Sequence, residues 1–116
     1  MRSRLMLAAA CIAALPVTGH AQDLDRDSAN YVMKGCRAFL AKANRDAFLR
    51  GVCAGTVHAI AGIAWDSELC MPTAVTVEQE IQVVVAYIDA RPDRLHQDFR
   101  NLTLEALKEA WPCKPR

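Results

Sequence analysis

Histidines, cysteines and paired acidic residues are the side chains of this chain that could do chemistry. A histidine in catalysis needs a nucleophile and an orienting acid, and neither His58 nor His96 stands in such a motif. Asp66 and Glu68 lie close together in a loop-like stretch, where two solvated acids are the common case. The sequence has no Gly-rich phosphate loop and no metal-ligand spacing. We therefore expect no enzyme, no catalytic residue, no cofactor and no metal, and we favour a binding role.

The N-terminus has the pattern of a secretory signal peptide. Two arginines precede an uninterrupted apolar run at residues 5–15, and small residues follow it up to Ala21. This run is shorter than the roughly 20 residues of a membrane-spanning helix, and no later segment is expected to span a bilayer. We predict a signal peptide at residues 1–21, cleaved near Ala21, one domain at residues 22–116, and a periplasmic location.

The charge balance argues against a polyanionic partner. Removing the two leader arginines from the 14 Lys and Arg leaves 12, against 13 Asp and Glu. The two signs are interspersed, and no basic surplus remains to attract nucleic acid or anionic lipid. We expect neither nucleic acid nor, after cleavage of the leader, a membrane as partner.

Apolar periodicity predicts an all-α chain, a small bundle of four or five helices. Ser28 and Asp46 are expected to cap the first two helices. Thr76 and Gln79 have the capping-box pattern, and Pro92 suits the first position of a fourth helix. The expected helices are residues 29–43, 47–64, 77–90 and 92–111.

The helix at residues 47–64 is expected to be the centre of the bundle. Gly51, Gly55 and Ala59 are four apart and so share one helical face. Gly costs roughly 1 kcal/mol in a helix interior, so we expect neighbouring helices to pack closely on this face as compensation. Gly35 permits a similar close approach in the first helix.

Four cysteines remain after the leader. An even number in a short exported chain indicates disulfides, and the absence of CxxC or paired His disfavours a zinc site. Three connectivities are open on number alone. The cysteines are Cys36, Cys53, Cys70 and Cys113.

Hairpin symmetry selects one of these connectivities. Residues equidistant from the turn of an antiparallel helical hairpin lie opposite each other. The first two cysteines are centred on the turn at residues 44–45, and the last two on the turn at residues 91–92. We predict disulfides Cys36–Cys53 and Cys70–Cys113, which staple the bundle.

The longest expected loop is residues 65–74. It begins with an aromatic residue beside two acids, a composition that suits an interface anchor. We predict that this loop binds a protein partner. Its candidate contact residues are Trp65, Asp66, Ser67 and Glu68.

The order of short motifs along the chain resembles the Rap/Tai family of exported immunity proteins. The motifs are C-x-G at residues 53–55, C-x-P…V-T at 70–76, Y-I-x-x-x-P-x-x-x-H at 87–96 and W-P-C at 111–113. The resemblance implies a helical, disulfide-bonded periplasmic protein without catalytic activity. It also implies binding and blocking of a peptidoglycan amidase effector delivered by type VI secretion, often as a homodimer.

Two other functions compete with immunity. A helical bundle of this size also resembles the periplasmic acid-stress chaperones of the Hde type, although their cysteine layout differs. A chaperone should expose apolar surface on acidification, whereas an immunity protein should bind one partner tightly at neutral pH. The third hypothesis is an accessory exported protein without a toxin partner.

Overall fold

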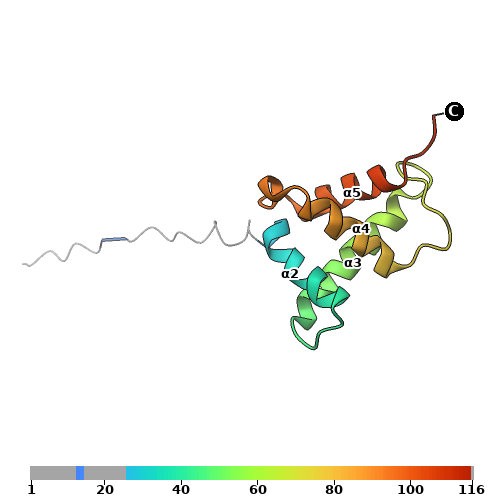
Figure 1. Ribbon diagram of the computed structural model, residues 1–116. Helices are drawn as coiled ribbons and strands as arrows, with labels where there is room; N and C mark the ends of the chain where they lie inside the picture. The colour runs from blue at the N-terminus through green and yellow to red at the C-terminus, as the bar shows by residue number, and fades with distance from the viewer. Residues whose placement is uncertain (1–12, 15–25, 116) are drawn as a thin grey trace, which may run out of the picture.

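The computed structural model describes residues 13–14 and 26–115. The predicted signal peptide and its cleavage site therefore lie outside the described residues, apart from residues 13 and 14. The described part contains helices and two isolated β-bridges, but no strand. The predicted all-α bundle is therefore confirmed (Figure 1). Its elements are α2 (Ala29–Leu40), α3 (Ala47–Ala64), α4 (Val77–Asp89), the 3-10 turn η1 (Pro92–Arg94) and α5 (Phe99–Ala110).

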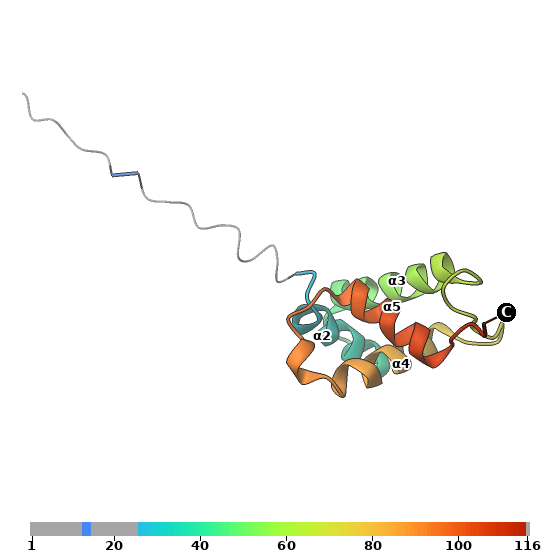
Figure 2. The same cartoon turned by 90° about the horizontal axis from the view of Figure 1, so that it is seen from above.

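α3 is the central helix, in contact with α2, α4 and α5 (Figures 1 and 2). Its buried residues recur every three or four positions, so they form one stripe along the helix. The stripe consists of Leu49, Cys53, Val57, Ala61 and Ala64.

The face of α3 that carries the glycines is exposed, so the expectation of close packing on it is wrong. Gly51, Gly55 and Ala59 are exposed, and a Cβ added at either glycine would meet no atom within 4 Å. The reason is the orientation of α3 about its own axis: its buried stripe, and not the face with the small residues, is turned toward the three neighbouring helices.

α3 also corrects the expectation that no later segment could span a bilayer. By length and composition alone, this helix is long and apolar enough to cross a membrane. The central helix of a bundle passes the same test, and α3 packs its buried stripe against three helices. A disulfide also ties it to α2.

Close helix packing occurs instead at Gly35 of α2. Gly35 is buried, and a Cβ there would overlap the backbone carbonyl of Leu49 in α3. Cys36, the next residue, is bonded to Cys53 across the same hairpin, with the two Cα atoms 5.3 Å apart. The missing side chain thus lets the α2 and α3 backbones come together where the disulfide forms.

The predicted fourth helix is interrupted, which corrects its expected span from Pro92. η1 ends at Arg94, and α5 begins only at Phe99. Backbone groups between them bond to the chain entering α2: the carbonyls of residues 95 and 97 accept from Asn30 and Ala29, and Phe99 N–H donates to the residue 27 carbonyl. Asp98 accepts from the N–H groups of residues 100 and 101 and so starts a new helix.

Helix caps agree with the sequence only in part. The capping box of Thr76 and Gln79 is confirmed in both directions. Asp46 holds the N-cap position of α3, but it has a left-handed backbone (φ 53°) and makes no capping bond. Ser28 precedes α2 without a side-chain cap, and α2 ends at Leu40 rather than at residue 43.

A polar network joins α4, η1 and α5 on the surface. Arg94 donates to Glu105 at 2.9 Å and to the Tyr87 hydroxyl at 3.2 Å, and Tyr87 in turn donates to Glu105 at 2.8 Å. These bonds, chiefly the one from Arg94, lower the pKa of Glu105. Arg91 lies over the Tyr87 ring, 3.6 Å from its centroid. The network thus links α4, η1 and α5 across the break between η1 and α5.

Candidate protein-binding site

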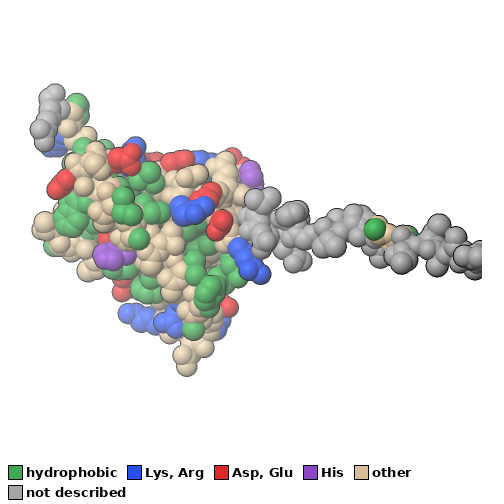
Figure 3. All heavy atoms as spheres, turned by 180° about the vertical axis from the view of Figure 1, so that it is seen from behind, with side chains coloured by type: hydrophobic (Ala, Val, Ile, Leu, Met, Phe, Trp, Pro, Cys, Tyr) green, Lys and Arg blue, Asp and Glu red, His purple; other side chains and the backbone are tan. Residues whose placement is uncertain are grey.

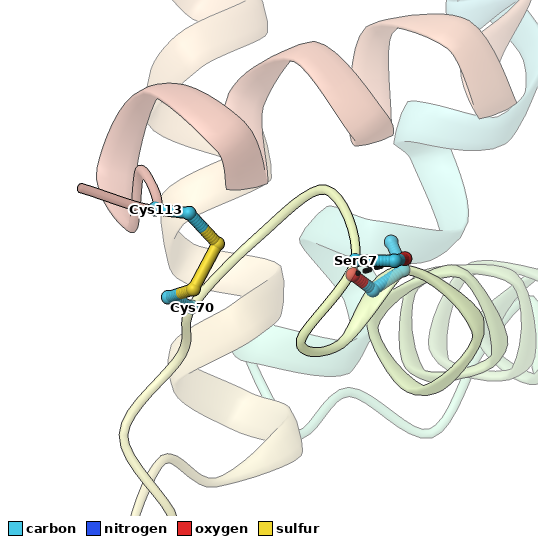
Figure 4. The surroundings of a disulfide bond; sticks show 4 residues. Ser67, Cys70 and Cys113 are labelled. Carbon is cyan, nitrogen blue, oxygen red and sulfur yellow. Dashed lines mark hydrogen bonds between the residues drawn. A yellow bond between two sulfur atoms is a disulfide. The ribbon is translucent and has the colours of Figure 1, made fainter. Parts of the chain in front are cut away.

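The loop after α3 is a tight hook rather than an extended loop. The Ala64 carbonyl accepts from the N–H groups of Ser67, Glu68 and Leu69 at 3.2, 2.9 and 3.1 Å, and from the Ser67 hydroxyl at 3.1 Å. Figure 4 shows Ser67 in this turn. Asp66 N–H donates to the Leu69 carbonyl at 2.9 Å. Asp66 also has a left-handed backbone, with φ 60°. We call residues 65–69 the hook.

The hook consists of four exposed residues between two buried ones. Ala64, just before the hook, and Leu69, its last residue, are buried, while the four residues between them are exposed. These four are Trp65, Asp66, Ser67 and Glu68, the predicted partner-binding residues. The structure therefore places the four on one short, internally bonded turn, but the remainder of the predicted loop, residues 70–74, lies outside it.

The second disulfide fixes the chain immediately after the hook. Cys70 and Cys113 form a disulfide with Cα atoms 4.8 Å apart (Figure 4). Cys70 N–H also donates to the Trp111 carbonyl at 2.9 Å. This disulfide and the Cys36–Cys53 disulfide are the two pairs that the hairpin argument predicts. The hook is thus anchored by the core on both sides and by the end of α5.

The carboxylates of the hook are not neutralised by neighbouring cations. Within residues 26–115, neither Asp66 nor Glu68 takes part in a salt bridge, in contrast to Asp89 with Arg37 and Asp98 with Arg100. The hook therefore presents negative charge that is free to meet a positive partner surface.

An apolar groove opens beside the hook, between α3 and α5. It has a volume of about 230 Å³, and Ile63, 82% exposed, stands at its edge. Exposed apolar side chains lie in patches between charged ones on the face opposite that of Figure 1 (Figure 3). The groove is lined by Ile60, Ile63, Ala64, Glu68, Arg100, Asn101 and Leu104.

The two histidines among residues 26–115, His58 and His96, differ in their surroundings. His96 is exposed, next to η1. His58 Nδ1 lies 3.3 Å from Oε2 of Glu80 in α4, whose side chain is only 1% exposed. Among the described residues, no three His, Cys, Asp or Glu side chains gather as a metal site.

Glu80 in α4 is a buried acidic residue that was not among the predicted site residues. Its spacing carried the signal: residues 80, 84 and 88 are four apart, and all three are buried. The position in the first turn of α4 favours a carboxylate through the helix dipole, and His58 supplies the polar partner.

We predict that His58→Ala destabilises the fold by about 1–3 kcal/mol, because it leaves a buried carboxylate without its hydrogen-bond partner. The exposed His96→Ala is the matched control and should change the free energy of unfolding by less than about 0.5 kcal/mol. Urea denaturation followed by circular dichroism measures both. In a Glu80→Gln background the loss from His58→Ala should shrink, and an undiminished loss would contradict the pairing.

Fold and surface together define a disulfide-stapled helical protein with a rigid, acidic hook beside an apolar groove. This arrangement suits the binding of a protein partner. The sequence matches the family of Rap1a immunity proteins over residues 7–113. The chain therefore belongs to the Rap1a immunity protein family. No curated protein and no solved structure matches it.

Proposed function

We propose that this chain is a periplasmic immunity protein that binds a peptidoglycan amidase effector of type VI secretion and blocks it without catalysis. Membership of the Rap1a family supports immunity against an effector. The signal peptide predicted at residues 1–21 supports export to the compartment where peptidoglycan lies. The observation that carries the proposal is the hook, with four exposed residues held between buried Ala64 and Leu69.

Rigidity makes the hook suitable for covering an enzyme cleft. A flexible loop loses conformational freedom when it binds, which weakens the complex. The four hydrogen bonds to the Ala64 carbonyl and the Cys70–Cys113 disulfide order the hook before any partner arrives. Trp65, 38% exposed, can serve as an aromatic anchor, while Asp66 and Glu68 supply charge for specificity.

We predict that Asp66→Ala/Glu68→Ala lowers the affinity for the proposed amidase effector by at least about tenfold, or about 1.4 kcal/mol. The physical reason is the loss of both unpaired carboxylates from the interface. The control variant Glu78→Ala/Asp93→Ala removes the same charge from the α4 and η1 surface. Biolayer interferometry with the purified amidase measures all three proteins.

A growth assay tests the function in cells. The amidase is directed to the periplasm of a bacterial host, with or without the full chain. Growth should be rescued by the wild-type chain and by the control variant, and less well by the hook variant. Lysis in the presence of an exported, folded wild-type chain would overturn the immunity proposal.

We further propose that two copies form a homodimer, which the family resemblance implies. The mass in solution, measured by sedimentation, decides between one copy and two.

A further inference from the structure

We propose that the groove between α3 and α5 is the anchor pocket of the effector interface, and that it receives one large apolar side chain of the effector with a lysine or arginine next to it. This inference rests on the proposed function. It names the chemistry that the effector must present and extends the binding surface from the hook to α5.

The size and lining of the groove select an apolar side chain. An apolar cavity of about 150 Å³ is enough for a benzene ring, so the groove, at about 230 Å³, has room for one aromatic or long aliphatic side chain. Ile60, Ile63 and Leu104 line it. Ile63 is the most exposed large apolar side chain among the described residues, at 82%, and side chains that seat in such pockets dominate interface energetics.

The charges at the groove select a neighbouring cation. Arg100 lines one side, but its Nε and Nη2 donate to Asp98 at 3.1 and 2.6 Å, and Asp27 lies 3.8 Å away. Glu68 lines the groove as well and has no ion pair within residues 26–115. The uncompensated charge at the groove is therefore negative. A complementary partner places a positive side chain there, and an anionic partner is disfavoured.

The groove and the hook form one continuous surface. Ala64 and Glu68 line the groove, and the same two residues are joined by the hook hydrogen bond from Glu68 N–H to the Ala64 carbonyl at 2.9 Å. The wall of the groove is thus held by the bonds that order the hook. An effector that meets Glu68 of the hook therefore also meets the groove that Glu68 lines.

Ile63→Asp tests the pocket. Because Ile63 is largely exposed, the variant keeps the core intact, and circular dichroism verifies its fold. The matched control is Phe48→Asp, which makes the same change at a 75% exposed residue of the same helix. The two positions are 15 residues, or about 22 Å, apart along the helix. The probe is the purified amidase effector of the proposed function, with Kd measured by titration calorimetry.

We expect Ile63→Asp to raise Kd at least about tenfold while Phe48→Asp leaves it within about twofold. Glu68→Lys should also raise Kd, and more strongly at low salt than at high salt, because it repels the cation. An unchanged Kd for Ile63→Asp, or equal losses for the two aspartate variants, would overturn the pocket while the immunity function stands. A wild-type chain that does not bind the amidase would overturn both.

Discussion

Gly35→Ala is expected to destabilise the protein by about 3 kcal/mol, among the largest effects of any single methyl group in this chain. The added Cβ would overlap the Leu49 backbone carbonyl. A backbone atom cannot rotate away as a side chain does, so α2 and α3 must move apart. Overpacking of a tight core costs about 1–3 kcal/mol and sometimes more, and here separation also strains the adjacent Cys36–Cys53 link.

Gly55→Ala is the matched control in the neighbouring helix. A Cβ at Gly55 meets open space, and alanine is favoured over glycine in a helix by up to about 1 kcal/mol. The two Gly→Ala changes should therefore have opposite signs. Urea denaturation of oxidised residues 22–116 measures both. Equal midpoints for Gly35→Ala and wild type would contradict the close approach of the two backbones.

Removing the disulfides is the second large effect. On the loop-entropy model, Cys36→Ala/Cys53→Ala should cost about 3 kcal/mol and Cys70→Ala/Cys113→Ala about 4 kcal/mol, from sequence separations of 17 and 43. Their sum approaches the whole stability of a small domain, about 5–15 kcal/mol. We expect the fully reduced protein to be largely unfolded at 37 °C.

Calorimetry of the two double variants and of the reduced wild type measures these costs. Peptide mapping under non-reducing conditions provides the control, because it identifies the linked cysteines directly. A fragment joining Cys36 to Cys70 would contradict both pairs, and an unfolding temperature unaffected by reduction would contradict their stabilising role.

The helices of this fold could be predicted where local signals act alone. α3 and α4 begin at the predicted residues, the latter because Thr76 and Gln79 cap it through their own side chains. The cysteine pairs follow from hairpin geometry, which needs only the position of each turn. In both cases, residues close in sequence or symmetric about a turn carry the information.

The break before α5 could not be predicted from local pattern. The helical spacing of Leu95, Phe99 and Leu102 runs through it, but tertiary hydrogen bonds to residues 27–30 take up the backbone groups instead. Asp98, a good N-cap residue, was the one local sign of a new start.

In the candidate site, too, local features could be predicted from the sequence and tertiary ones could not. Its four exposed residues were predicted from composition, yet the hook depends on one carbonyl, that of Ala64, which accepts four hydrogen bonds. The groove depends on how α3 crosses α5, and no residue spacing encodes that crossing. The exposed glycine face of α3 was misassigned because small residues at helical spacing suit either close packing or an uncovered surface.

Titration of the oxidised mature chain into the purified amidase, with hydrolysis of peptidoglycan followed in parallel, tests the central claim most directly. The account predicts saturable binding at neutral pH and a loss of hydrolysis in proportion to the complex formed. Undiminished hydrolysis at a saturating concentration of the chain would contradict the account. Binding to many unrelated periplasmic proteins that grows as the pH falls would also contradict it and would favour a chaperone.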